Sequence, residues 1–384
     1  MNLHAKRTRV AIVGIAVLAL TLAACGSKAK SKKSGAASTS VSAGGATSGG
    51  STSGGSATGT ASGKPFNACM VLDVGGVDDK SFNQSSYAGM TAANKANPNL
   101  KISYVPSQTQ NEYVPNLNAE VSKGCDSIIA VGGLMFDAVK AVSAKNPTKH
   151  FAEVDAGSTG ANVYGLQFNT AQGAFLGGYL AAATSKSGKV ATFGGLNIPP
   201  VTIYMDGFWE GVQYYNKQKS KSVKVLGWDE TKQKSGTFAQ SFTDKNKGKQ
   251  ISQTFIQQGA DVIFPVAGGT GAGAGAAAQA SGGKVSVMWV DTDGCVSLPE
   301  FCKYFLSSVT KGLATSVEKY LTDASGGTFP TGSYIGTLDN GGTGLAPFHD
   351  FDSKVPQAVK DDLDKIKAGI IDKSIPISSP SQPK

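Results

Sequence analysis

Aspartate side chains recur at the ends of short apolar segments in this 384-residue sequence. A polar, turn-rich stretch containing Asp73 and Asp79 closes the first apolar segment, and Asp155 and Asp291 end two later ones. A charge at the end of a buried strand is costly unless another group meets it. We therefore expect a ligand or a lysine at these carboxylates, whose oxygens suit a neutral ligand with neighbouring hydroxyl groups.

The segments that position these residues alternate in character. Short, almost continuous apolar runs predict strands buried on both faces, and the amphipathic stretches between them predict helices. Repeated strand–helix units predict doubly wound, parallel α/β sheets, and about 320 foldable residues exceed one such sheet, so two lobes follow. The ligand crevice of such sheets lies beyond the carboxyl ends of the strands. The predicted strands are 66–74, 102–105, 127–131, 151–155, 163–168, 190–193, 223–228, 262–266 and 285–291; the predicted helices include 84–96, 114–123, 136–145, 170–185, 201–217, 248–258 and 271–280.

Charge and composition exclude several function classes. The formal net charge is +9, but eight positive charges lie in residues 1–64, so the remainder lacks the basic surface that nucleic-acid binding needs. Arg7 and Arg9 are the only arginines, which leaves no guanidinium for an anionic ligand after residue 9. The sequence has three histidines, of which His150 directly precedes the predicted strand 151–155, and this argues against a histidine-built metal site or catalytic centre.

The first 64 residues indicate export. A charged segment through Arg9 precedes the apolar stretch 10–22, which is too short to span a bilayer permanently and suits a signal peptide. The residues Leu-Ala-Ala-Cys that end at Cys25 resemble a lipobox, so we expect a lipoprotein signal peptide at 1–24 and an acylated Cys25. An ordinary secretory signal is the alternative. The Gly-, Ser-, Ala- and Lys-rich stretch 25–64 is expected to be a disordered tether.

Export places the remaining cysteines where disulfides persist. Cys69 opens the first predicted strand and Cys125 just precedes another, so neighbouring strand starts would bring them together. We predict the pairs Cys69–Cys125 and Cys295–Cys302, the second closing a short loop. Free buried thiols are the alternative.

Several motifs resemble one known family. The run DVGGVDDKSFNQSSYAGM from Asp73, with YVPNL, FAEVD, GAFLGGYLAA, GADVIFPVAGGTGAG, VDTD and SSVTKGLATSV following in order, resembles the basic membrane protein family. Members are lipid-anchored substrate-binding proteins of ABC importers, with known ligands among the purine and other nucleosides. The resemblance implies the type I periplasmic-binding fold, with two lobes joined by a hinge. We expect lobe 1 at 66–168 plus 294–336, and lobe 2 at 169–293 plus 337–384.

The resemblance also implies ligand contacts. Asp291 falls on the family's ribose-binding aspartate, and Phe82 and Phe242 on its stacking aromatics. Asp79 stands where some relatives have Asn, which leaves the preferred nucleobase open. Lys311 is expected at a helix start, where its charge opposes the helix dipole and needs a partner. The full set of expected contacts is Asp73, Asp79, Phe82, Asp155, Phe242, Gly268, Asp291 and Lys311.

Each feature also has a simpler interpretation. Asp73 and Asp79 could cap the helix that follows them, and Phe82 could belong to the core. The glycine-rich stretch from Gly268 matches the outline of a dinucleotide fingerprint, although a turn that brings the backbone close to a neutral ligand accounts for it equally. A hydrolase that uses the cleft aspartates, and a surface adhesin or sensor with a vestigial ligand site, are the alternative functions.

These considerations favour a binding protein rather than an enzyme. We expect a monomer on the outer face of the cell membrane, which captures a nucleoside and delivers it to the permease and ATPase subunits of an importer. No cofactor, metal or nucleic acid is expected.

Overall fold

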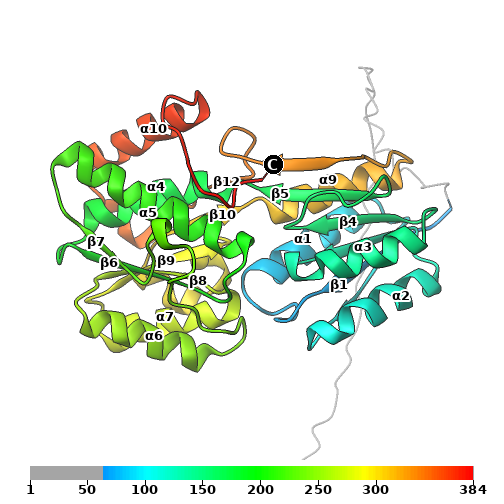
Figure 1. The fold of residues 1–384 in the computed structure, drawn as a ribbon, viewed down its shortest axis with the longest axis horizontal. Coiled ribbons are helices and arrows are strands. Elements are labelled where there is room, and N and C mark those ends of the chain that lie inside the picture. The colour runs from blue at the N-terminus through cyan, green and yellow to red at the C-terminus, as the bar shows by residue number, and fades with distance from the viewer. Residues whose placement is uncertain (1–63, 384) are drawn as a thin grey trace, which may run out of the picture. The chain divides into compact units, whose positions relative to one another are not determined.

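The computed structural model describes residues 64–383, which form two lobes with one six-stranded sheet each (Figure 1). The expected signal peptide, Cys25 and nearly all of the tether lie outside the described residues. Within residues 64–383, no helix is both long and apolar enough to cross a membrane.

The first lobe is built on a fully parallel sheet with the strand order β11-β5-β4-β3-β1-β2. Its helices α1 and α9 pack against one face, and α2 and α3 cover the other. The elements are β1 (Phe66–Leu72), α1 (Phe82–Ala96), β2 (Leu100–Pro106), α2 (Tyr113–Lys123), β3 (Ser127–Val131), α3 (Phe136–Lys145), β4 (His150–Val154), β5 (Val163–Phe168), α9 (Leu313–Ser325) and β11 (Ser333–Gly336).

The second lobe repeats this plan with the order β12-β10-β9-β8-β6-β7, in which β12 alone runs antiparallel to its neighbour. Helices α4 and α5 pack closely because Gly178 of α4 leaves room for the backbone at Phe208 of α5. The elements are α4 (Thr170–Thr184), β6 (Lys189–Gly194), α5 (Pro199–Lys219), β7 (Lys224–Leu226), α6 (Lys245–Gln257), β8 (Val262–Val266), α7 (Ala272–Ala280), β9 (Ser286–Asp291), α8 (Gly294–Ser297), β10 (Phe305–Lys311), β12 (Thr343–Leu345) and α10 (Gln357–Ile371).

The chain passes between the lobes three times, between β5 and α4, between β10 and α9, and between β11 and β12. The expected assignment of 294–336 to the first lobe is therefore wrong in part. Strand β10 pairs with β9 and β12 in the second sheet, whereas α9 and β11 belong to the first lobe. The crossing follows Lys311 rather than preceding residue 294.

In both sheets the strand order reverses where a later strand lies beside an earlier one, at β1 and β3 in the first lobe and at β6 and β8 in the second. Loops that leave strands on either side of such a switch point diverge, and a crevice opens between them. The residues that follow these strands therefore border that crevice.

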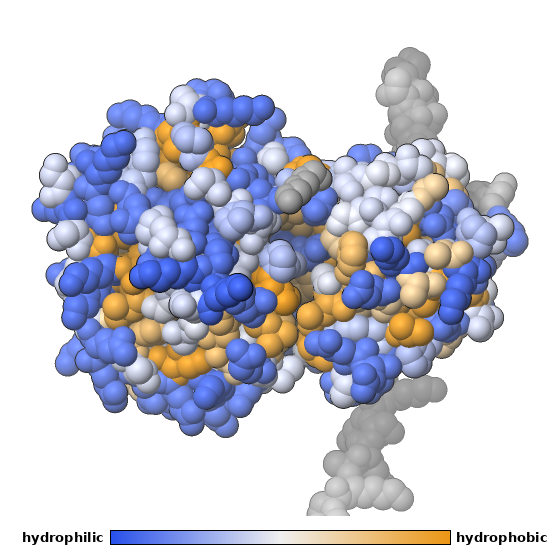
Figure 2. Space-filling view, in the orientation of Figure 1, coloured by the Kyte–Doolittle hydropathy of each residue, from blue (hydrophilic) through white to orange (hydrophobic). Residues whose placement is uncertain are grey.

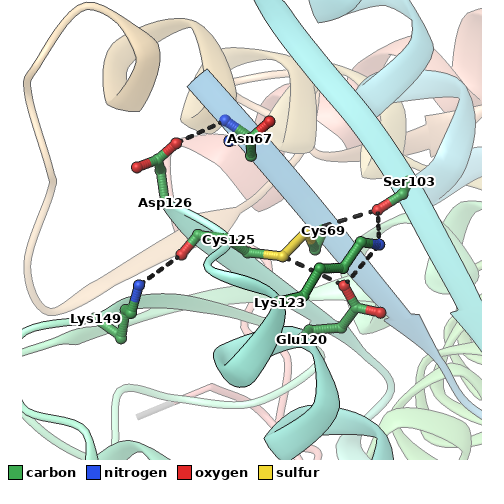
Figure 3. The surroundings of a disulfide bond; sticks show 8 residues. All are labelled: Asn67, Cys69, Ser103, Glu120, Lys123, Cys125, Asp126 and Lys149. Carbon is green, nitrogen blue, oxygen red and sulfur yellow. Dashed lines mark hydrogen bonds and ion pairs between the residues drawn. A yellow bond between two sulfur atoms is a disulfide. The ribbon is translucent and has the colours of Figure 1, made fainter. Parts of the chain in front are cut away.

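Two disulfides join the cysteines in the pairs that the sequence analysis expected. Cys69 of β1 is bonded to Cys125, which immediately precedes β3, with 6.0 Å between their Cα atoms. Both sulfur atoms are buried beside the Glu120 carboxylate, which is paired with Lys123 (Figure 3). The second disulfide, Cys295–Cys302, closes a short loop after β9.

Candidate ligand cavity

A cavity lies between the lobes, lined by residues that follow β1, β3 and β4 on one side and β6, β8, β9 and β10 on the other. Figure 2 shows apolar surface gathered where the two lobes meet. All eight residues expected from the sequence line this cavity, namely Asp73, Asp79, Phe82, Asp155, Phe242, Gly268, Asp291 and Lys311.

A buried ion pair crosses the cavity from one lobe to the other. The Lys311 ammonium lies 2.5 Å from Oδ1 of Asp155 and donates to Oδ2 at 2.6 Å. Burial raises the pKa of Asp155, and attraction to Lys311 offsets part of that rise. Lys311 is the last residue of β10 rather than part of a helix start, and its charge meets the partner that the sequence analysis required.

The Asp291 carboxylate is held by one donor from each lobe. The Tyr204 hydroxyl, on α5, donates to Oδ1 at 2.7 Å, and the Ser81 hydroxyl donates to Oδ2 at 2.6 Å. Burial and the nearby Asp291 raise the pKa of Tyr204 well above its usual value, so its hydroxyl remains a donor. Each carboxylate oxygen keeps a further lone pair that can accept a bond.

Asp73 is paired with Asn83 at the switch point of the first sheet. The Asn83 amide donates to Oδ1 of Asp73 at 2.8 Å, and its own buried Oδ1 has no hydrogen-bond partner among the described residues. Burial raises the pKa of Asp73 to about 8, against the lowering effect of the Asn83 bond. Gly132 packs directly on this carboxylate. Its φ of 124° is one that residues with a side chain rarely adopt.

Asp79 caps helix α1, as the simpler interpretation of the sequence proposed. Its carboxylate accepts bonds from the backbone N–H groups of Ser81, Asn83 and Gln84, at 2.8 to 3.1 Å. Burial raises its pKa to about 6, although these bonds lower it. The residue also lines the cavity, so capping and contact with a ligand are compatible.

The two aromatic rings come from opposite lobes. Phe82 begins α1 and packs partly on the core of the first lobe, with the Lys311 ammonium 4.8 Å from its ring centre. Phe242 packs partly on the second lobe's core, against the Cα side of Gly195 and near Gly268. A side chain at Gly195 would displace the ring, so this glycine allows Phe242 to lie at the cavity wall.

Asp155 and Asp291 occupy corresponding places in the two lobes. Each stands at the carboxyl end of the third strand from the same edge of its sheet, β4 and β9. Each adopts a left-handed backbone conformation, with φ of 69° and 64°. Non-glycine residues in this region are uncommon and cluster at functional sites, where the surrounding structure holds them in place.

Sequence reasoning missed two polar residues of the cavity. Tyr204 lies within a predicted amphipathic helix, where a tyrosine among apolar residues is expected to belong to the hydrophobic core. Asn83 stands inside the motif that opens at Asp73, but nothing in the sequence shows that its amide would pair with that carboxylate and leave an oxygen free.

Among the residues that the structure describes, none form a metal site in the cavity. Within residues 64–383, two clusters have metal-ligand geometry, Cys69–Glu120–Cys125 and Asp293–Cys295–His349, and both lie outside the cavity. Their cysteines are all engaged in disulfides.

Comparison with known proteins decides the family. Residues 66–379 match the Bmp family model, described as ABC transporter substrate-binding protein PnrA-like. The chain belongs to the Bmp family of ABC transporter substrate-binding proteins. It is 32% identical over 333 residues to the CD4+ T-cell-stimulating antigen of Listeria monocytogenes, with 82% of this chain and 89% of that protein covered. It is 30% identical to the ABC transporter nucleoside-binding protein BmpA of Lactococcus lactis, with 81% and 89% covered.

Solved structures support the fold of this Bmp family member. A solute-binding protein from Aeropyrum pernix matches with a TM-score of 0.75 at 23% identity, covering 82% of this chain and 94% of that one. A periplasmic solute-binding protein from Actinobacillus succinogenes with bound D-allose matches with a TM-score of 0.55 at 15% identity, covering 76% and 99%. The two lobes thus have the type I periplasmic-binding fold.

Proposed function

We propose that this protein captures a nucleoside, and a purine nucleoside in particular, between its lobes and delivers it to an ABC importer. The observation that carries the proposal is the arrangement of the cavity, where one aromatic ring from each lobe and several carboxyl groups surround a single ammonium group. The printed name of the Lactococcus lactis relative supports the same ligand class.

The aromatic rings suit the base of a nucleoside. Phe82 and Phe242 offer apolar faces from opposite lobes, and the two rings of a purine provide a larger area for such contact than a pyrimidine does. The free Oδ1 of Asn83 calls for a donor, which an N–H group of the base supplies.

The carboxylates suit the sugar. Asp291 is fixed by Tyr204 and Ser81, and its remaining lone pairs accept bonds from two neighbouring ribose hydroxyls. Because Ser81 belongs to the first lobe and Asp291 to the second, the sugar site is complete when the lobes are closed. Binding and closure are therefore coupled.

The proposed location is the outer face of the membrane. It rests on the lipobox-like sequence at Cys25 and on the disulfides, which persist in an oxidising compartment. A lipid anchor there keeps the receptor near the permease and ATPase subunits that we propose as its partners.

Isothermal titration of the unacylated protein with adenosine, guanosine, inosine, uridine and cytidine tests the proposal. We expect saturable binding of at least one nucleoside, with purines bound more tightly than pyrimidines. Recovery of the unchanged nucleoside after long incubation separates binding from hydrolysis. Absence of heat with all five compounds would refute the nucleoside assignment while leaving the family membership intact.

A further inference from the structure

A second recess in the second lobe gathers four lysines. It is a groove at the starts of β8, β9 and β10, lined by Lys186, Lys284, Lys303 and Lys354 together with the rings of Tyr304 and Phe351. We call this recess the lysine groove.

The lysine groove lies away from the ligand cavity. Tyr304 directly precedes β10, whereas Lys311, which lines the cavity, is the last residue of the same strand. Likewise, Ser286 and Asp291 are the first and last residues of β9. Strands of this length span roughly 20 Å, so the two recesses lie at opposite ends of the same strands.

The positive charge of the four lysines is only partly balanced by the residues that line the groove. None of its four lysines forms an ion pair within residues 64–383. Asp261 is the groove's carboxylate, and it already accepts bonds from the Ser185 hydroxyl and from two backbone N–H groups. These bonds fix the turn after α4, and the Asp261 carboxylate offsets one of the four positive charges.

Two of the ammonium groups are positioned over aromatic rings. The Lys303 ammonium lies 5.1 Å from the ring centre of Tyr304, and that of Lys354 lies 4.2 Å from the ring centre of Phe351. Such contacts orient a lysine, but they neither neutralise its charge nor occupy its N–H groups in hydrogen bonds. Both lysines consequently present free N–H donors beside the groove.

We propose that the lysine groove is a second binding site, which takes a phosphate-bearing group carrying at least two negative charges. Lysines act as compact point charges with several donors each, so a cluster of them suits the spread oxygens of phosphate rather than a planar carboxylate. The group is either the headgroup of an anionic lipid or a soluble phosphate compound. The site does not depend on the proposed nucleoside function.

The test compares the wild-type protein with the double variant Lys303→Gln/Lys354→Gln. The matched control is Lys140→Gln/Lys145→Gln, which removes the same charge from exposed positions of α3 in the first lobe. Each protein is titrated calorimetrically with inorganic pyrophosphate, and is floated with vesicles of pure phosphatidylcholine or of phosphatidylcholine mixed with phosphatidylglycerol. Both measurements use the unacylated protein, at low and at physiological salt.

We expect the groove variant to lose about tenfold or more in affinity, while the control keeps the wild-type value. Tight binding of pyrophosphate without flotation identifies a soluble phosphate compound. Flotation on the anionic vesicles with weak pyrophosphate binding identifies a lipid headgroup. Equal affinities of the groove variant and the control, or no binding in either measurement, would overturn the proposal.

Discussion

Asp73 and Asp79 of the cavity hold their protons more tightly than free aspartates do. Burial raises the pKa of Asp73 to about 8 and that of Asp79 to about 6. Asp73 is therefore mostly protonated at neutral pH and able to donate a hydrogen bond, while the Asn83 amide remains its donor partner. A protonated acid beside a free amide oxygen gives this end of the cavity both a donor and an acceptor.

Asp73 should make the stability of the ligand-free protein depend on pH. An ordinary aspartate has a pKa of about 4, so between about pH 4 and pH 8 the folded protein holds a proton that the unfolded chain has released. The contribution of this group is fully present below about pH 4 and is lost as the pH rises through about 8.

Asp73→Asn should remove this loss of stability at high pH, because the new amide stays neutral and its oxygen still accepts the bond from Asn83. Thermal unfolding from about pH 5 to about pH 9 should show the wild type losing stability relative to the variant. The exposed neighbour Asp78 supplies the control Asp78→Asn, which should follow the wild type. Parallel curves for Asp73→Asn and the wild type would contradict the proposed protonation.

Asp291→Ala should weaken the binding of nucleosides much more than the binding of free bases, because only the nucleoside presents two neighbouring hydroxyl groups. Loss of charge-assisted bonds should cost the nucleoside about tenfold to a hundredfold in affinity, measured by calorimetry. Asp78→Ala again serves as the control. An equal loss for nucleoside and base would place the sugar elsewhere in the cavity.

Among the elements, the two disulfides should differ in their contribution to stability. Cys69–Cys125 closes a loop of 56 residues and Cys295–Cys302 one of 7. Loop-closure entropy predicts a loss of about 4 kcal/mol in the free energy of unfolding for Cys69→Ser/Cys125→Ser, and about 2 kcal/mol for Cys295→Ser/Cys302→Ser. Urea denaturation of both double variants under oxidising conditions checks the order, and a larger loss for the short loop would contradict it.

The elements also show how far the sequence predicted the fold. The apolar runs up to residue 291 correspond to β1–β9, because strands buried on both faces leave a strong signal. Strand β10 was missed because Ser307, Ser308 and Thr310 interrupt its apolar pattern, and without it the lobe boundary was misplaced. Local patterns say little about which sheet a late strand joins.

The cavity shows the same limit. The aspartates at strand ends could be located because a parallel sheet gathers such ends at one edge. The pairing of Asp155 with Lys311, and of Asp291 with Tyr204, joins residues more than eighty positions apart. The first contact follows from the closure of the lobes and the second from the packing of α5 within the second lobe, and no local pattern encodes either.

For the whole molecule, closure and charge act together. The bonds from Ser81 to Asp291 and from Lys311 to Asp155 join the two lobes across the cavity. Lys311 is the only cationic side chain among the lining residues that the structure describes, and it is paired with Asp155. Asp79 and Asp291 add negative charge that no lining cation balances, whereas Asp73 is mostly protonated at neutral pH. The closed cavity therefore favours a neutral ligand over an anionic one.

The central claim is that the lobes close on an uncharged nucleoside. Calorimetric titration of each nucleoside that binds, alongside its 5′-monophosphate, tests it most directly. One uncompensated repulsion at about 4 Å is worth roughly 4 kcal/mol at an effective dielectric constant near 20, so the monophosphate should bind at least about a hundredfold more weakly. Comparable affinities of a nucleoside and its monophosphate would contradict the account.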